Sequence, residues 1–306
     1  MAKYVIAIVG PTAIGKTARA IALAKHFSTE IISTDSRQFF KEMHIGTAVP
    51  SPQELNQVKH HFIQHLSIFD SYSVGDFERD TLLLLEKLFR SHDVVLLVGG
   101  SGLYMDAVLY GLDDFPETDP SLRHGLNAVF NKEGIGALQD RLQELDPDYY
   151  AKVDLENPHR LIRALEISIS SGRPYSSFLA GKKKERGFTP ILIGIDAERN
   201  VIYERINRRV DKMMEDGLLE EARELFKHST LNALNTVGYK ELFAYFEGKI
   251  TLEKAVGEIK KNTRRFAKRQ LTWYRKNEHL VWLDHRLSET EFISSVDLLL
   301  KERSHA

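Results

Sequence analysis

The sequence predicts an α/β fold, a parallel sheet that is flanked by helices and interrupted by a helical insertion. Short apolar runs without polar alternation recur along the 306 residues, which is typical of strands covered on both faces. Helical patterns lie between these runs, as expected for parallel strands joined by crossover helices. The segment 121–187 departs from this order, because it holds helical patterns and no convincing strand.

The individual elements follow from the same patterns. Strands are expected at 4–9, 30–34, 94–98, 191–195 and 280–283. Core helices are expected at 17–27, 77–90 and 201–226, and insertion helices at 122–130, 135–145 and 159–170. An acidic stretch with two prolines at 113–120 suits a boundary. We therefore predict an α/β core of residues 1–115 and 188–306, and a helical insertion of residues 116–187.

The motif GPTAIGKT matches the pattern Gly-x-x-x-x-Gly-Lys-Thr between a predicted strand and a predicted helix. In that context, backbone N–H groups and the helix N-terminus bind an anion, Lys16 adds a charge, and Thr17 offers a hydroxyl to Mg²⁺. This predicts a P-loop NTPase-like sheet and a phosphorylated ligand, in preference to a turn without function. A nucleoside triphosphate, a nucleoside monophosphate and another diphosphate all remain open. The predicted cradle is Gly10, Pro11, Thr12, Ala13, Ile14, Gly15, Lys16 and Thr17.

Two other strand ends carry information about the chemistry. Asp35 follows the second strand, which we expect to neighbour the phosphate loop; its carboxylate can bind Mg²⁺ through water, accept a proton or cap a helix. The strand at 94–98 ends in Gly99 and Gly100, without the acid that motor-type P-loop ATPases place there. Hydrolytic motor or switch function is therefore disfavoured. The glycines either admit another molecule close to the backbone or form a tight turn into a helix.

Basic residues are concentrated in two places, although the net charge is only −1. Between 260 and 276 they occur without any acid, and a helix would place Lys261, Arg265, Lys268 and Arg275 on one face. Phe266, Gln270 and Trp273 would form a largely apolar anchor on another face, which favours a phosphate-tracking helix over a solvated one. The run at 182–186 is interpreted as a solvated loop rather than a phosphate contact.

The helical pattern at 205–218 contains arginines between apolar positions. Met213 and Met214 are expected in the core, and at least one arginine is expected to reach the site, where a guanidinium can bind a diphosphate. No apolar run approaches the roughly 20 residues of a membrane-spanning helix. Zero cysteines exclude disulfides and cysteine-ligated zinc. We expect a cytoplasmic protein without a membrane partner.

Taken in order, these motifs resemble the bacterial tRNA dimethylallyltransferases, also called tRNA isopentenyltransferases. The resemblance runs through nearly the whole chain in GPTAIGKT, DSRQ, GGSGLY, NPHRLIRALE, RRVDKMMEDGL, NTVGYKE and TRRFAKRQLTWYR. It implies transfer of a dimethylallyl group from dimethylallyl diphosphate to N6 of adenosine 37 in tRNA, with release of diphosphate. The phosphate loop would then hold the diphosphate of the donor, and the protein would act as a monomer.

The resemblance also implies roles for individual residues. The catalytic residues would be Asp35 as general base, Arg209 on the diphosphate, and Thr17 on Mg²⁺ or phosphate. The target base would leave the anticodon stack. Contacts with the anticodon stem-loop of tRNA are expected from Asp35, Ser36, Arg37, Gln38, Ser101, Arg123, His159, Arg160, Leu161, Ile162, Arg163, Gly238, Tyr239, Lys240, Lys268 and Arg269.

Two other functions remain open. One is a P-loop small-molecule kinase, or an adenylate prenyltransferase, that acts on free nucleotide. The other is a non-catalytic RNA-binding module that uses a nucleotide as a switch, against which the missing strand-end acid argues.

Overall fold

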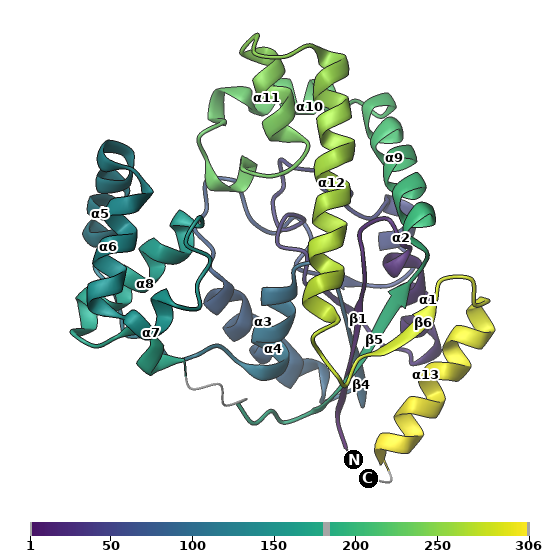
Figure 1. The fold of residues 1–306 in the computed structure, drawn as a ribbon. Coiled ribbons are helices and arrows are strands. Elements are labelled where there is room, and N and C mark those ends of the chain that lie inside the picture. Colours follow the sequence, from purple (N-terminus) through teal and green to yellow (C-terminus); the bar gives the residue numbers. More distant parts are fainter. Residues whose placement is uncertain (1, 180–183, 305–306) are drawn as a thin grey trace. The chain divides into compact units, whose positions relative to one another are not determined.

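The computed structural model describes residues 2–179 and 184–304 (Figure 1). The contacts divide the chain into two compact units. We call the first, Met1–Tyr110 with Glu185–Ala306, the α/β core, and the second, Gly111–Lys184, the helical unit.

The α/β core is built on a six-stranded parallel sheet with the strand order β3-β2-β4-β1-β5-β6, as the fold prediction requires. The five predicted strands are confirmed. The strand at 60–61 was not predicted, because two residues are too few to show a periodic pattern. The strands are β1 (Tyr4–Val9), β2 (Ile31–Ser33), β3 (His60–His61), β4 (Val94–Val98), β5 (Thr189–Asp196) and β6 (Val281–Asp284).

Helices cover both faces of the sheet, which explains why its strands are continuously apolar. Ile6 and Ile8 of β1 pack in a cluster with residues of α1 and α13, whereas Val5 and Ala7 pack with residues of α3 and α4 on the opposite face. The helices around the sheet are α1 (Lys16–His26), α2 (Pro52–Leu55), α3 (Val74–Leu88), α4 (Gly102–Tyr110) and α13 (Glu289–Ser304).

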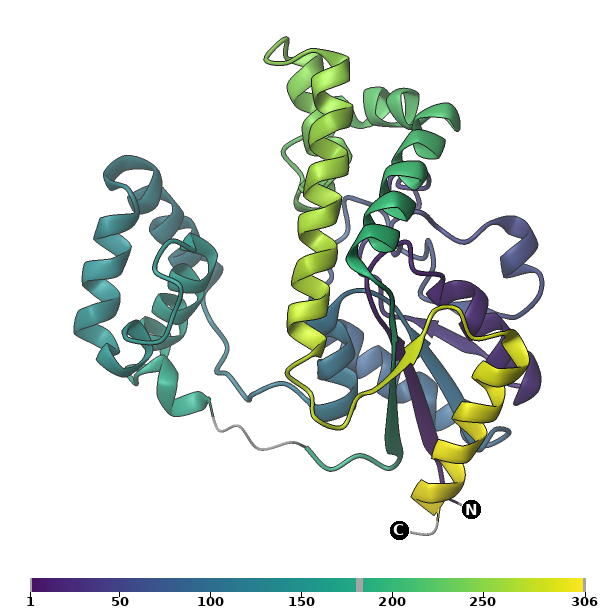
Figure 2. The ribbon, with the colours of Figure 1, turned by 45° about the vertical axis from the view of Figure 1, so that its right-hand side comes forward.

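A further group of helices extends beyond the carboxyl ends of the strands, with the long helix α12 beside α9 (Figure 2). The group has its own hydrophobic cluster, which includes Leu218, Tyr239 and Ile259. Met213 and Met214 pack against it, which confirms their expected role. The helices are α9 (Arg199–Glu215), α10 (Leu218–Leu225), α11 (Tyr239–Phe246) and α12 (Leu252–Tyr274), with short 3₁₀ turns η2 (Phe226–His228) and η3 (Asn232–Leu234).

The prediction of one helix over 201–226 is wrong. Gly217 has a φ of +103°, in the left-handed region, so the chain breaks between α9 and α10. Glycine adopts this conformation without the steric cost that a Cβ would bring, and it therefore ends helices readily.

The helical unit has a separate core. Leu126, Leu138, Leu142 and Leu165 come together from three helices that begin at polar caps or at glycine, such as Asn157, whose side chain accepts the N–H of Arg160. The three predicted insertion helices are confirmed. The elements are α5 (Pro120–Glu133), α6 (Ile135–Leu145), α7 (Pro147–Tyr150), α8 (Pro158–Ser171) and the 3₁₀ turn η1 (Tyr175–Phe178).

The second basic run, predicted to be solvated, is exposed at Lys184 and Glu185 but not at Arg186. Lys182 and Lys183 lie outside the described residues. The side chain of Arg186 is only 10% exposed and donates to the carboxylate of Glu78 and to the carbonyl oxygen of Ala107. This guanidinium is held by an ion pair before β5 begins. Across residues 2–179 and 184–304, no helix combines the length and the hydropathy of a membrane span.

Candidate active site

The phosphate loop joins β1 to α1 and depends on glycine at both ends. Gly10 has a φ of +140°, and a Cβ there would lie 2.6 Å from the carbonyl oxygen of Ile195 on β5. Gly15, with a φ of +103°, immediately precedes the first residue of α1. The side chain of Ile14 is buried in the core, so this residue offers a ligand its backbone alone. The predicted strand, loop and helix are therefore present.

Lys16 lies at the start of α1 and is half-buried. Its Nζ donates to the carbonyl oxygens of Gly10 and Pro11, at 3.1 and 2.9 Å. Burial, together with the nearby charge of Arg209, lowers the pKa of Lys16 to about 8, while the carboxylate of Asp35 acts in the opposite direction. An anion bound beside Lys16 would favour its charged form. The charged form of Lys16 is therefore most stable when an anion is bound to the loop.

Two arginines of α9 reach the same loop. The Nη1 of Arg209 donates to the Oγ1 of Thr12 at 3.2 Å, and the Nη1 of Arg205 donates to the carbonyl oxygen of Ile14 at 3.1 Å. They are four residues apart and so lie on one helical face. Burial lowers the pKa of Arg209 from its ordinary value, although a guanidinium stays charged in proteins. The expectation that an arginine of this helix reaches the site is confirmed.

The sequence analysis does not single out Arg205. Its spacing of four residues from Arg209 is the signal that could have selected it. Arg208, the first residue of the motif RRVDKMMEDGL, is exposed and pairs with Glu204 at 3.3 Å. The helical period thus separates the arginines that face the loop from the one that faces solvent.

The strand that leads to Asp35 does not adjoin β1, so the prediction that it neighbours the phosphate loop is wrong. β4 lies between them, since Val98 pairs with Ser33 on one side and with Ile8 on the other. Asp35 nevertheless lies close enough to Lys16 to influence its ionisation. The reason is found at the end of β4.

Gly99 and Gly100 leave room for the polypeptide that follows β2. A Cβ on Gly99 would lie 2.2 Å from the Oγ1 of Thr34, and a Cβ on Gly100 would lie 2.2 Å from the Nε2 of Gln270 and 3.9 Å from the Oδ2 of Asp35. Any side chain at these positions would displace its neighbours. The glycines thus serve close packing inside the protein: Gly99 lets the backbone that carries Asp35 lie against the end of β4, and Gly100 leaves room for the amide of Gln270.

Asp35 itself caps a turn and not a helix, so the helix-cap interpretation is wrong. Its Oδ1 accepts the N–H of Arg37 at 3.1 Å, and a turn follows. Burial raises the pKa of Asp35, against the opposing effects of its turn hydrogen bond and of Lys16, Arg37 and Arg209. Because its pKa is raised, this half-buried carboxylate binds a proton more tightly than an ordinary aspartate does.

The residues after Asp35 are tied to neighbouring loops. The Oγ of Ser101 lies 3.2 Å from the Oγ of Ser36 and accepts its N–H at the same distance. The side chain of Arg37 donates to the carbonyl oxygens of Asn232 and Ala233, at 3.1 and 2.9 Å. The amide of Gln38 donates in the same way to the carbonyl oxygens of Thr47 and Ala48. Ser36 and Ser101 are thus brought together beside Asp35, while Arg37 and Gln38 hold loops in place.

Tyr239 corrects one expectation of the sequence. Gly238 and Tyr239 are buried, so the tyrosine ring has no surface for RNA, whereas Lys240 is exposed. The Tyr239 hydroxyl donates to the Oε1 of Glu221 at 2.7 Å. A Cβ on Gly46 would lie 2.6 Å from the tyrosine ring, so the ring fills the space beside that glycine.

Glu221 organises the loop around Gly46. Its carboxylate accepts backbone N–H groups from His44, Ile45 and Gly46, at 3.0, 2.7 and 2.9 Å, in addition to the tyrosine hydroxyl. The replacement Glu221→Ala should lower the free energy of unfolding by about 2–4 kcal/mol, because it leaves several donors unpaired. Urea denaturation measures this, with the exposed neighbour Glu220→Ala as the matched control. Equal stability of the two variants would contradict the assignment.

The predicted RNA-contact residues of α8 lie on different faces of the helix, some buried and some exposed. Leu161 and Ile162 are buried in the core of the helical unit, so the expectation that their side chains bind RNA is wrong. His159 and Arg160 are exposed and Arg163 is half-buried. Arg123 is engaged with the buried carboxylate of Glu166, its Nε donating to Oε1 at 2.7 Å.

The anchor predicted for the basic helix α12 is only partly right. Gln270 is buried as expected, but Phe266 and Trp273 are 37% and 40% exposed, and Ala267 and Tyr274 are buried in their place. Exposed basic residues on the helix include Arg265, Lys268 and Arg269.

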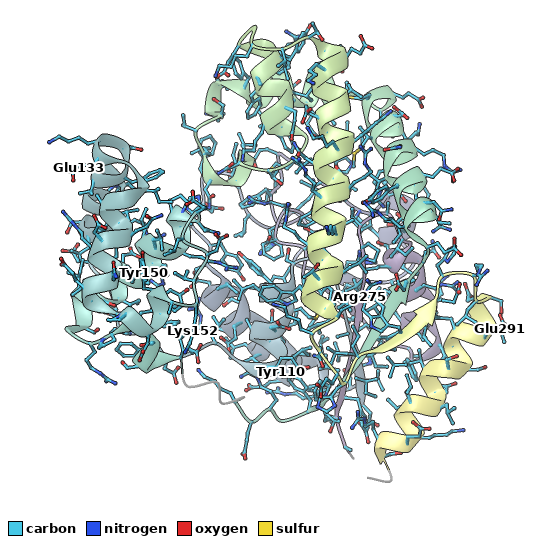
Figure 3. The ribbon with its side chains drawn as sticks, viewed as in Figure 1. Tyr110, Glu133, Tyr150, Lys152, Arg275 and Glu291 are labelled. Atoms are coloured by element: carbon cyan, nitrogen blue, oxygen red, sulfur yellow. The ribbon has the colours of Figure 1, made fainter. Side chains whose placement is uncertain are left out.

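Arg275, expected on the basic face, is tied to the sheet. It lies at the end of α12 (Figure 3), where its guanidinium donates to the Oδ2 of Asp196 at 3.0 Å. The Nε1 of Trp273 donates to the Oδ2 of Asp106 at 2.8 Å. Arg275 remains exposed, but its charge is paired with Asp196.

Gln270 was not recognised as a site residue. Its side chain is 4% exposed, its Oε1 accepts the N–H of Thr12 at 2.8 Å, and its Nε2 donates to the carbonyl oxygen of Gly100 at 2.9 Å. An amide among apolar residues on the buried face of a helix was the available signal, because buried polar groups require partners.

The donor groups fit a magnesium ion held mainly by substrate. Within the described parts of the chain, no group of three His, Cys, Asp or Glu side chains forms a metal site. Mg²⁺ is commonly bound by one or two protein ligands together with substrate phosphate oxygens and water. The hydroxyl of Thr17, in the first turn of α1, suits such an arrangement.

Comparison with known proteins places this site in a family. The family model described as IPP transferase matches residues 38–277, more than half of the chain. A tRNA dimethylallyltransferase of Flavobacterium johnsoniae is 59% identical over 297 residues, which cover 95% of this chain and 96% of that protein. One of Christiangramia forsetii is 61% identical over 284 residues, 93% and 94% of the two chains.

Solved structures agree with this. The full-length tRNA isopentenylpyrophosphate transferase of Bacillus halodurans is 38% identical and superposes with a TM-score of 0.73, covering 99% of this chain and 98% of that one. A eukaryotic dimethylallyltransferase acting on tRNA is 26% identical and superposes with a TM-score of 0.79, over 93% and 74% of the chains. Sequence and fold thus agree over nearly the whole length, and the chain belongs to the IPP transferase family.

Proposed function

We propose that this protein transfers a dimethylallyl group from dimethylallyl diphosphate to N6 of adenosine 37 in tRNA and releases diphosphate. The observation that carries the proposal is the half-buried carboxylate of Asp35 beside the cations of the phosphate loop, Lys16 and Arg209. A base and an anion-binding group close together suit a reaction in which a proton and a diphosphate leave the same centre. The activity named for the relatives is of this kind.

The phosphate loop and its arginines bind the donor in this proposal. Pro11 has no N–H, and the N–H of Thr12 is taken by Gln270, so the diphosphate is held by N–H groups later in the loop. Lys16 and Arg209 compensate the charge that develops as the carbon–oxygen bond of the donor breaks. Mg²⁺, with Thr17 as a protein ligand, would add positive charge to the diphosphate.

Asp35 acts on the acceptor. The N6 amino group of adenine is a weak nucleophile because its lone pair is delocalised into the ring. As this lone pair forms the new bond to the dimethylallyl carbon, the bonding pair of the carbon–oxygen bond leaves with the diphosphate, and Asp35 accepts a proton from N6. The base must leave the anticodon stack to reach this position, where Ser36 and Ser101 lie beside Asp35.

The proposal includes a monomer that acts in the cytoplasm, where tRNA serves translation. Its support is that Asp35, Lys16, Arg205 and Arg209 all come from one chain.

The direct test is product formation. Incubation of the protein with unmodified tRNA, Mg²⁺ and dimethylallyl diphosphate should yield isopentenyladenosine, measured by mass spectrometry of the nucleosides. A parallel reaction with AMP in place of tRNA tests the free-nucleotide alternative. The proposal fails if no tRNA that contains adenosine 37 is modified, and the alternative replaces it if AMP reacts as well as tRNA.

Binding of tRNA should depend on the exposed charges of α12. We expect Lys268→Ala and Arg269→Ala each to weaken binding and to reduce the slope of log affinity against log salt by about 1, because each removes a phosphate contact. Filter binding over a range of salt concentrations measures both quantities. Lys301→Ala on α13 is the control and should leave the slope unchanged. A slope equal to wild type in the α12 variants would exclude that face as the RNA contact.

A further inference from the structure

We infer that Gln270 is a positioning residue that couples the RNA-binding helix α12 to the donor-binding phosphate loop, an inference that rests on the proposed function. The side chain touches neither reacting group. It joins two backbone segments, Thr12 in the phosphate loop and Gly100 in the turn after β4, through one amide.

Both halves of this amide are used. The Oε1 accepts from Thr12 at 2.8 Å and the Nε2 donates to Gly100 at 2.9 Å, and the latter bond is fully buried. A carboxylate would lack the donor, and an apolar side chain would leave both backbone groups without partners. The absence of a side chain at Gly100 is what admits the amide, since a Cβ there would lie 2.2 Å from Nε2.

The two hydrogen bonds of Gln270, which we call the bridge, lie between the donor site and the base. At one end, Thr12 accepts a hydrogen bond from Arg209, which belongs to the donor site. At the other end, the space that a Cβ of Gly100 would occupy is bounded by both Gln270 and the Oδ2 of Asp35. Gln270 therefore ties the phosphate loop to the turn that lies beside the base. Displacements of about 1 Å at such a place can cost about 100-fold in rate.

The same helix carries the exposed charges proposed to hold tRNA. Lys268 and Arg269 lie directly before Gln270 in the sequence and face solvent, while Gln270 faces the loops. RNA that holds α12 in place thus also holds the phosphate loop. The expected consequence is that the amide contributes to the rate of transfer and not to the affinity for tRNA.

The test begins with Gln270→Met, which keeps the length of the side chain and removes both hydrogen bonds. We expect kcat to fall about 10- to 100-fold while KM for tRNA changes less than about twofold. Ile259→Ala, on the buried face of the same helix and away from both loops, is the matched control. It should lower Tm and leave kcat unchanged, which separates loss of stability from loss of positioning.

Gln270→Glu tests the position of this side chain through the pH–rate profile, which a merely structural role would not change. It places a second carboxylate near Asp35, whose charged neighbours are Lys16 of α1, Arg37 of its own turn and Arg209 of α9, with the buried hydroxyl of Tyr274 also nearby. A like charge disfavours ionisation of Asp35, so the acid limb of the pH–rate profile should move to higher pH. In Gln270→Met the limb should stay in place.

A third measurement is independent of activity. Hydrogen exchange of the backbone N–H groups in the phosphate loop should be faster in Gln270→Met than in wild type, because Thr12 loses its acceptor. A wild-type kcat in Gln270→Met, or an unmoved acid limb in Gln270→Glu, would overturn the inference. If the wild-type protein forms no product, the proposed function fails by itself, and equal loop exchange in wild type and Gln270→Met then overturns the bridge.

Discussion

Replacement of Asp35 by asparagine should lower the rate of transfer by about 10²- to 10⁴-fold, the range typical for removal of a general base. The amide keeps the size of the side chain and an acceptor for the N–H of Arg37, but it cannot take the proton from N6. Single-turnover measurements with bound tRNA isolate this step. Affinity for tRNA should remain within about twofold of wild type. Asp93→Asn, at the amino end of β4, is the control and should retain full activity.

The stability of this variant distinguishes a base from a structural carboxylate. Burial raises the pKa of Asp35 in the folded protein, so its ionised form is disfavoured by folding. Stability from this group is therefore full below the ordinary pKa of aspartate and is lost as pH rises through the higher folded value. At neutral pH, Asp35→Asn should unfold at the same temperature as wild type or above it. A large drop in Tm with retained activity would contradict the assignment.

The raised pKa of Asp35 also determines how activity falls at low pH. The base works in its ionised form, so the rate should fall as pH drops through the raised pKa of Asp35, above the ordinary range of an aspartate. The pH profile of kcat reports this limb in the complex with both substrates.

Replacement of Lys16 by methionine should reduce kcat/KM for dimethylallyl diphosphate by about 10²- to 10³-fold, the usual effect of removing one preorganised group that stabilises developing charge. Methionine keeps an unbranched side chain of similar length in this half-buried position, while the cation is lost. Steady-state rates at varied donor concentration measure the change. Lys25→Met, later in α1 and exposed, is the matched control.

The pKa of Lys16 adds a pH signature. Since burial lowers it to about 8, the free protein loses this charge as pH rises through that value. Donor affinity should therefore weaken above about pH 8 in wild type, and this basic limb should be absent in Lys16→Met. An identical pH dependence of donor binding in the two proteins would remove Lys16 from the diphosphate site.

Much of the site was predictable from local patterns. The conformation of the phosphate loop is set by residues adjacent in sequence. Gly10 and Gly15 adopt positive φ between a strand and a helix, so the two glycines at this spacing predict the loop. The strand ends at Asp35 and Gly99 were visible for the same reason. The roles of Arg209 and of Asp35 as a base came from the resemblance to a family.

Other features depended on partners far away in sequence. Tyr239 and Leu161 lie in motifs that suggest RNA contacts, but each is buried by residues that only the fold brings near. Helical spacing predicts that Phe266 and Trp273 belong to an apolar anchor, but it shows only which side chains share a face and not which face is covered.

The sequence by itself determined the local chemistry of this protein, a phosphate loop next to a strand of a parallel sheet and a carboxylate after another strand. The tertiary structure decided how these parts meet. β4 separates β1 from β2, and the backbone that carries Asp35 packs against the end of β4 because Gly99 has no side chain there. Gln270, 258 residues from Thr12, completes the arrangement. The physical reason is that backbone conformation is set by adjacent residues, whereas burial and hydrogen-bond partners are set by the packing of the whole chain.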